Sequence, residues 1–125
     1  MFMYAMRRLG ILAAAAAVAA CAGEPVTEPD GARLFARHCA SCHGSFGEGD
    51  GPVAEVMQVA VPNLRSLSAR ANGSFPRDAV MRYIDGREVP AAHGERLMPV
   101  WGDSFEAAAG DAIAAITDFV ERLQN

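Results

Sequence analysis

Hydrophobic positions recur at helical spacing in the C-terminal part of this chain. From about Ala107 to Leu123, apolar residues return every three or four positions, and charged residues occupy positions between them. The apolar set consists of Ala112, Ile113, Ile116, Phe119, Val120 and Leu123. This spacing places the set on one face of a helix, and that face has to pack against another part of the protein.

A second helix is predicted near the middle of the first half of the chain. Asp30 is a favourable N-cap, and the stretch from Gly31 to about Ala40 carries Leu34 and Phe35 on one side. The eight residues 44–51 that follow contain four glycines. Such a density of glycine predicts a loop.

Two further short helices are predicted between these ends. The stretch 64–71 has helical character, and Asn72-Gly73 is a typical left-handed stop. Pro76 suits the first turn of another helix, which Asp85-Gly86 ends. No stretch alternates between apolar and polar residues as a strand would, so we expect an all-α domain of four to five short helices.

The N-terminus has the order of an export signal. Arg7 and Arg8 precede the uncharged, alanine-rich stretch 9–20. That stretch is too short to cross a bilayer comfortably and suits the apolar region of a signal peptide, which we expect to cover residues 1–20. The alternative is a short helix of the mature domain.

Cys21 allows two interpretations of the cleavage site. Val18-Ala19-Ala20-Cys21 resembles the bacterial lipoprotein box, in which the cysteine is lipidated and becomes the new N-terminus. Ala20-Cys21-Ala22 instead satisfies the small-x-small rule of ordinary signal peptidase, which would discard Cys21. We favour lipidation, because it accounts for a third cysteine and anchors the protein to a membrane. Residues 21–29 then form a tether, and the folded domain spans 30–125.

Composition excludes some functions. The 125 residues carry a formal net charge of −4, and all eleven basic residues are arginine. This balance argues against a nucleic-acid-binding surface, which requires a basic face. No serine–histidine–acid arrangement, phosphate-binding loop or carboxylate cluster stands out, so we expect no catalytic site of its own and no small-molecule substrate.

The strongest chemical signal is Cys39-Ala40-Ser41-Cys42-His43. Two cysteines three positions apart, with histidine directly after the second, are typical of covalent haem c attachment. Each thiol bonds one haem vinyl group, and the imidazole of His43 becomes an axial iron ligand. A thioredoxin-like redox pair or a zinc site would also use the cysteines. Neither of these requires His43, and no second cysteine pair supplies further zinc ligands.

Met98 is the expected second axial ligand. It lies in Leu97-Met98-Pro99, where proline stiffens the backbone, and Trp101 can pack on the haem edge. Met57 and Met81 lie in apolar stretches and are interpreted as core residues. Coordination by His93, or an open iron site, would be the alternatives. His38 is expected to point away from the haem.

Together with Gly31-Ala32-Arg33-Leu34-Phe35 and Gly47-Glu48-Gly49-Asp50-Gly51-Pro52, these motifs resemble small bacterial class I cytochromes c. The resemblance implies their fold, with short helices wrapped around one covalently bound haem. It implies a proline carbonyl that accepts a hydrogen bond from His43, at the position that Pro52 occupies. It also implies that Leu64 packs towards the porphyrin edge, and that Gly31 and Phe35 pack against Phe119.

The function implied is electron transfer by one haem between periplasmic or membrane redox partners whose identity is unknown. In this interpretation the protein sits on the periplasmic side of a bacterial membrane, anchored by lipidated Cys21, or is soluble in the periplasm. The alternative is a haem-bearing subunit of a larger periplasmic dehydrogenase or terminal oxidase. A non-haem binding domain that uses the cysteines for zinc or a disulfide is a third, less favoured interpretation.

Overall fold

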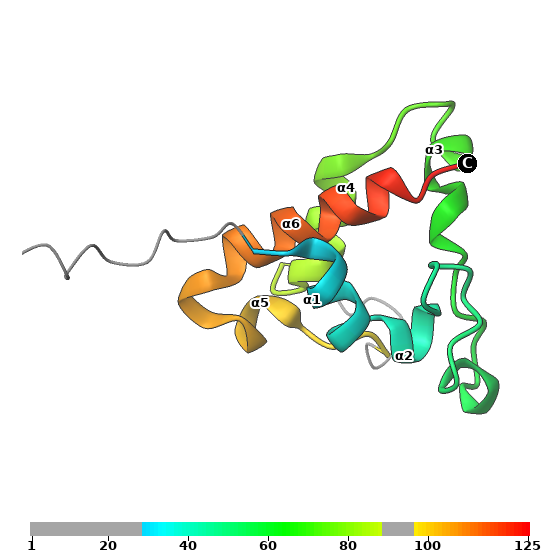
Figure 1. Ribbon diagram of the computed structural model, residues 1–125, viewed down its shortest axis with the longest axis horizontal. Coiled ribbons are helices and arrows are strands. Elements are labelled where there is room, and N and C mark those ends of the chain that lie inside the picture. Colours follow the sequence, from blue (N-terminus) through cyan, green and yellow to red (C-terminus); the bar gives the residue numbers. More distant parts are fainter. Residues whose placement is uncertain (1–28, 89–96) are drawn as a thin grey trace, which may run out of the picture.

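The computed structural model describes residues 29–88 and 97–125, and this part of the chain is helical (Figure 1). Six α-helices and three short 3-10 turns occur there, and the same residues form no strand. The all-α prediction is therefore confirmed for the described ranges. None of the helices found there is long and apolar enough to cross a membrane. The predicted signal peptide, Cys21, the tether up to residue 28 and His93 lie outside the described residues.

The helix α1 (Gly31–His38) begins where the sequence predicts. The carboxylate of Asp30 accepts hydrogen bonds from the backbone N–H groups of Ala32, at 3.1 Å, and Arg33, at 3.3 Å. These bonds satisfy two of the unpaired donors at the helix start. The helix ends at His38, slightly earlier than predicted, and the chain continues through Cys39 into α2 (Ala40–His43).

The helix α6 (Ala109–Arg122) crosses α1 and carries the C-terminal apolar face. The predicted crossing residues meet there, because the ring centroids of Phe35 and Phe119 are 5.0 Å apart. A Cβ atom added to Gly31 would lie 1.9 Å from the backbone oxygen of Ala115. The crossing is therefore so close that only glycine fits at position 31.

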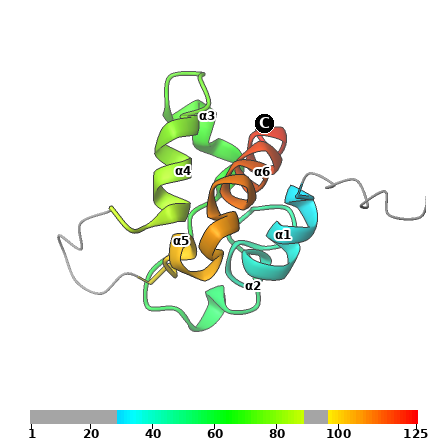
Figure 2. The ribbon, with the colours of Figure 1, turned by 90° about the vertical axis from the view of Figure 1, so that its left-hand side faces the viewer.

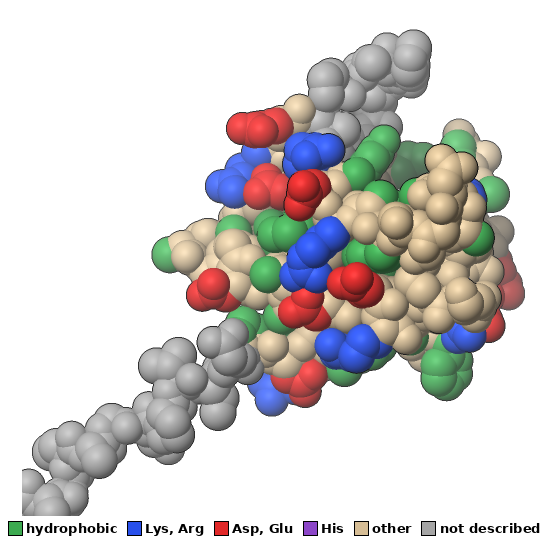
Figure 3. Space-filling view, turned by 90° about the horizontal axis from the view of Figure 1, so that it is seen from above, with side chains coloured by type: hydrophobic (Ala, Val, Ile, Leu, Met, Phe, Trp, Pro, Cys, Tyr) green, Lys and Arg blue, Asp and Glu red, His purple; other side chains and the backbone are tan. Residues whose placement is uncertain are grey.

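The helix α4 (Arg77–Asp85) runs beside α6, as Figure 2 shows. It ends at Gly86 with a φ of 77°, which matches the predicted stop. Pro76 occupies the N-cap position, one residue before the predicted first turn. Arg77 forms ion pairs with Asp118 and Glu121 of α6. Acidic and basic side chains are interspersed on the face seen in Figure 3.

The segment between α2 and α4 has little regular structure. It contains two 3-10 turns, at Ala54–Val56 and Leu64–Ser66, and the four-residue helix α3 (Leu67–Arg70). Asn72 and Gly73 follow with φ angles of 58° and 90°, which confirms the predicted left-handed stop. The C-terminus is tied to this segment, because the side chain of Gln124 donates a hydrogen bond to the Leu64 carbonyl at 2.8 Å.

The short helix α5 (Trp101–Ser104) follows Met98 and was not predicted. A 3-10 turn at Glu106–Ala108 then leads into α6, so that the regular last helix begins two residues later than about Ala107. Gly102 is buried. A Cβ atom at this position would lie 2.5 Å from both Asp85 Oδ1 and Arg87 Nε. The absence of a side chain thus lets α5 pack against the end of α4.

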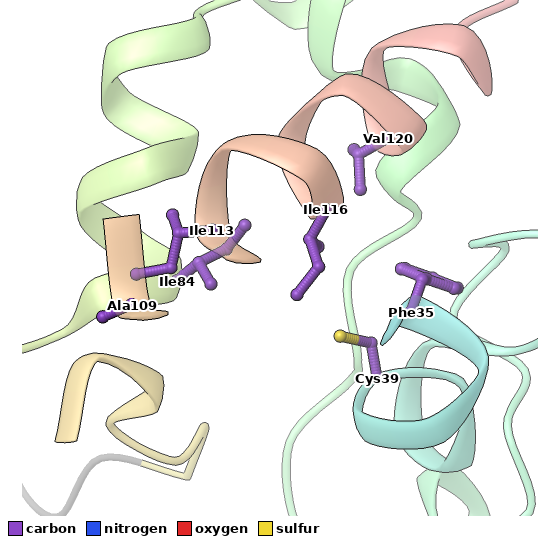
Figure 4. Packing of buried hydrophobic residues seen from close by; sticks show 7 residues of the cluster. All are labelled: Phe35, Cys39, Ile84, Ala109, Ile113, Ile116 and Val120. Carbon is purple, nitrogen blue, oxygen red and sulfur yellow. The ribbon is translucent and has the colours of Figure 1, made fainter. Parts of the chain in front are cut away.

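The buried core lies between α1, α4 and α6 (Figure 4). Its members are Phe35, Cys39, Ile84, Ala109, Ile113, Ile116 and Val120. The sulfur of Cys39 and the side chain of Ile116 point towards the same central space in Figure 4. The core therefore includes one of the two cysteines of the attachment motif.

Candidate haem site

Two cavities meet at the residues that the sequence singles out. The first has a volume of about 240 Å³ and the second about 260 Å³. Five residues line both cavities: Cys39, His43, Pro62, Tyr83 and Met98. The predicted attachment and iron-ligating residues Cys39, His43 and Met98 are thus brought together from separate parts of the chain, while Cys42 lines the second cavity.

The walls of both cavities are mostly apolar. In the first, Leu64 and Leu67 face side chains of α1, α4 and α6. In the second, Trp101 lies with Val59 and Leu97. The predicted packing positions of Leu64 and Trp101 are therefore at the cavities. An apolar wall excludes water from an iron site and thereby influences its reduction potential.

The loop that follows the cysteine motif folds back onto α2. The N–H of Gly51 donates to the Cys42 carbonyl at 3.2 Å, and the N–H of Val53 donates to the Ser41 carbonyl at 2.9 Å. A Cβ atom on Gly51 would lie 2.4 Å from the Ser41 oxygen. These contacts hold the loop on the back of the motif and satisfy its carbonyl groups.

The segment around Pro62 approaches His43 because the loop is rich in glycine. The N–H of Leu64 donates to the Gly47 carbonyl at 2.7 Å. Gly47 and Gly49 have φ angles of 74° and 83°, which side chains disfavour. The loop therefore brings the segment 61–64 close to the imidazole ring of His43.

His43 interacts with Pro62 and not with Pro52. Burial lowers the pKa of His43, while the backbone carbonyl of Pro62 acts in the opposite direction. Nδ1 of His43 is buried and has no regular hydrogen-bond partner in the described part of the chain, so Pro62 influences the ring as a nearby acceptor. Pro52 is exposed and lines neither cavity.

The prediction of Pro52 is therefore corrected to Pro62. Pro52 belongs to the loop that hydrogen-bonds to α2, and the chain reaches the imidazole only in the following extended segment. The sequence contains a feature that points to Pro62: proline directly before Asn63 favours an extended backbone that leads into the start of a helix. The side chain of Asn63 does cap that start, accepting from the Arg65 N–H at 2.9 Å.

The cysteines differ in environment. Cys39 is 8% exposed, and its burial raises the pKa of its thiol to about 12, with the neighbouring Cys42 adding to the effect. Cys42 is partly exposed. No disulfide joins these two cysteines. No group of three or more histidine, cysteine or acidic residues that could hold a metal ion occurs among residues 29–88 and 97–125.

Met57, His38 and Arg70 are among the cavity residues that were not predicted there. Met57, interpreted as a core residue, lines the second cavity but not the first. His38, expected to point away from the haem, lines the second cavity as well. Arg70 is the only charged residue among the described residues that line the first cavity. Its guanidinium group donates to the Asn63 carbonyl at 3.1 Å and also to the Ser66 hydroxyl.

These residues fit a haem c. Both cysteines, the imidazole of His43 and the thioether of Met98 line the second cavity, and its remaining wall and that of the first cavity are largely apolar. The low pKa of His43 favours the neutral imidazole, which is the form that ligates iron. Arg70 supplies a cation of the kind that binds a carboxylate such as a haem propionate.

Comparison with known proteins supports the same conclusion. The family model described as Cytochrome c matches residues 29–124. No curated protein and no solved structure matches the chain. The family match covers the cysteine motif, Met98 and the six helices that the described residues form. The chain therefore belongs to the cytochrome c family, and it is a class I, haem c-binding electron-transfer protein.

Proposed function

We propose that this cytochrome carries electrons between redox partner proteins through one haem held by Cys39 and Cys42, with His43 and Met98 as the two iron ligands. The observation that carries the ligand assignment is that His43 and Met98 line both cavities together with Cys39. Met57 reaches only the second cavity, which favours Met98 as the thioether ligand.

The protein's part in this function is to keep both axial positions filled. Haem c supplies a reversible one-electron couple when it is bound. A histidine–methionine pair raises its reduction potential relative to two histidines. Filled axial positions leave no open site for a substrate, which agrees with a carrier and not with a catalyst. We infer that the backbone carbonyl of Pro62, which lies near the His43 imidazole, orients this ligand.

Absorption spectroscopy of the haem-loaded protein tests the ligand assignment. We expect a low-spin, six-coordinate spectrum with the methionine–iron charge-transfer band in the oxidised state. Met98→Ala should abolish this band, and Met57→Ala should retain it, because both methionines line the second cavity but only Met98 reaches the first. A band that persists in Met98→Ala, or disappears in Met57→Ala, would contradict the assignment.

We further propose that partners approach the second cavity, where Cys42 lies. Its described lining contains no acidic residue, lysine or arginine. Val59 and Leu97 at this cavity are 51% and 55% exposed. An exposed apolar surface beside the cysteine edge of the haem would allow close contact with a partner, which electron transfer requires.

Membership of a larger oxidoreductase is a second candidate. The observation that favours it is Val56, which is 81% exposed and precedes the exposed Val59 by three residues. Permanent interfaces are more apolar than transient ones. Purification in mild detergent separates the two proposals. A stoichiometric subunit that stays bound favours the complex, and a monomeric cytochrome favours the mobile carrier.

For the location, we propose the periplasmic side of a bacterial membrane, with Cys21 as the lipid anchor. The support comes from the sequence alone: Arg7 and Arg8, the apolar stretch 9–20 and the small residues before Cys21. Mass spectrometry of the mature protein tests lipidation and haem addition together. A mature chain that begins after Cys21 and carries no lipid would show a soluble periplasmic protein.

A further inference from the structure

Three aromatic rings connect the cysteine-bearing end of α1 with the segment that follows Met98. The His38 ring centroid is 5.3 Å from that of Trp101, at an interplanar angle of 66°, and 5.3 Å from that of Phe105, at 84°. Trp101 and Phe105 are stacked, with centroids 5.7 Å apart. His38 therefore contacts both rings edge-on, a favoured geometry for aromatic pairs.

The positions of these rings relate them to the iron ligand. His38 is the last residue of α1 and directly precedes Cys39, while Trp101 and Phe105 begin and cap α5. Only Pro99 and Val100 separate Met98 from Trp101, and proline fixes one backbone angle of this short link. A contact that holds Trp101 in place thus restricts the position of Met98.

On the opposite side, α5 is held by α4. Gly102 packs so closely against Asp85 and Arg87 that a Cβ atom would lie 2.5 Å from each of them. The side chains of Asp85 and Arg87 form an ion pair at 2.7 Å. The helix α5 is thereby placed between the end of α4 and the His38 ring.

We propose that His38 is a positioning residue that holds Met98 on the iron by packing against Trp101 and Phe105. The proposal rests on the assignment of Met98 as an iron ligand. A thioether is a weak ligand, so the fraction of molecules in which Met98 is bound depends on how firmly the fold holds its segment. The role of His38 is one of ring packing against Trp101 and Phe105.

Competition with exogenous imidazole tests this proposal on the oxidised, haem-loaded protein. Imidazole binds iron only when Met98 leaves, so its apparent affinity reports how firmly Met98 is held. We expect His38→Ala to increase the imidazole affinity roughly tenfold, which corresponds to about 1.4 kcal/mol. His38→Phe should restore the wild-type affinity, because phenylalanine keeps an edge-to-face ring.

Matched variants separate positioning from general stability. Arg37→Ala changes the exposed neighbour on α1 and should leave the imidazole affinity unchanged. Phe105→Leu keeps an apolar side chain but removes the ring contacts with both His38 and Trp101, and should raise the imidazole affinity as His38→Ala does. It provides a second route if His38→Ala fails to fold. The methionine–iron band should be lost at lower denaturant concentration in both affected variants, before helical circular dichroism changes.

Two results would overturn the proposal in different ways. Unchanged imidazole affinity in His38→Ala, or in Phe105→Leu if the former does not fold, would show that the rings do not hold Met98. Failure of His38→Phe to rescue would show that packing is not the basis of the effect. If wild type lacks the methionine–iron band, or if Met98→Ala binds imidazole no more tightly, the ligand assignment fails, and the role of His38 fails with it.

Discussion

His43 and Arg70 show how single residues are adapted to the haem cavities. Burial lowers the pKa of His43, which favours the neutral imidazole, the form that ligates iron. Arg70 brings a fixed positive charge to the first cavity, whose other described lining residues include no second charged side chain. One residue thus supplies a ligand, and the other supplies charge at a distance from the iron.

Arg70→Gln is expected to lower the reduction potential. The oxidised haem carries one more positive charge than the reduced haem, so a nearby cation favours the reduced state, and its loss favours the oxidised state. We expect a decrease on the order of tens of millivolts, because Arg70 is exposed and its charge is screened by solvent and salt. Redox titration of the haem-loaded protein measures the shift.

Arg82→Gln is the matched control for this experiment. Arg82 is also exposed, but it lines neither of the two haem cavities. The reduction potential of Arg82→Gln should therefore change less than that of Arg70→Gln. Equal shifts in the two variants would show that net charge, and not the position of Arg70, determines the effect.

Among the helices, the crossing of α1 and α6 is the contact that places the cysteine motif. The two helices meet through Gly31 at one point and through the rings of Phe35 and Phe119 at another. Cys39 follows α1 directly, so any change in the crossing moves the first attachment cysteine. The predicted pairing of a small residue with an aromatic one is confirmed by these contacts.

Gly31→Ala should destabilise the protein. Its new Cβ would lie 1.9 Å from a backbone oxygen of α6, so the two helices would have to separate. We expect a loss of about 1–3 kcal/mol, the usual cost of overpacking, measured by denaturant unfolding of the haem-loaded protein. Wild-type stability in this variant would mean that the two helices are further apart than the structure shows.

Gly110→Ala provides the control at a second glycine in a helix. Apart from its chain neighbours and the backbone of its own helix, no atom lies within 4 Å of the Cβ position there. Alanine favours helix over glycine by up to about 1 kcal/mol, so this variant should be as stable as wild type or slightly more so. We therefore expect Gly31→Ala and Gly110→Ala to change the free energy of unfolding in opposite directions.

At the scale of the whole molecule, the hydrophobic core is built around the cavities. Phe35, Ile84, Ile116 and Val120 belong to the buried core and also line the first cavity. A domain of this size buries only a modest fraction of its surface with protein atoms alone. Covalent haem therefore completes the core.

Apo-protein should be largely unfolded for this reason. We expect Cys39→Ala/Cys42→Ala, produced without haem attachment, to show weak helical circular dichroism and no cooperative thermal transition. The core side chains at the first cavity would otherwise face empty space or water, which costs several kcal/mol in total, roughly as for large cavities in cores. Native-like helicity and cooperative melting of this double variant would contradict the expectation.

Electron exchange at the second cavity should depend weakly on salt. Its described lining contains no acidic residue, lysine or arginine, so electrostatic steering contributes little there, even though the full 125-residue sequence carries a formal net charge of −4. We expect the self-exchange rate between oxidised and reduced protein, measured by NMR, to change by less than about threefold between low and high salt.

Val59→Glu places a charge at this cavity and should slow self-exchange at low salt. Val53→Glu adds the same charge at an exposed position that lines neither cavity and should have a smaller effect. A strong salt dependence in wild type, or equal effects of the two variants, would place the exchange surface elsewhere.

The sequence by itself determines the local features of this protein. The cysteine motif, the cap at Asp30, the stops at Asn72-Gly73 and Gly86 and the apolar face of α6 depend on spacing and on backbone preferences a few residues long. These features are visible without a fold, because neighbours in the chain create them. The helix α5 is the exception, since its four residues carry too little periodic pattern to be recognised.

Only the tertiary structure decides which distant residues meet. It selects Pro62 over Pro52 beside His43, because the glycine loop folds back onto α2 before the chain reaches the ring. It places His38 against Trp101 and Phe105, and Met57 at the second cavity. The entropic cost of closing a loop depends only weakly on its length, so residues at many different spacings in the sequence can meet in this way. No local sequence pattern therefore specifies these contacts.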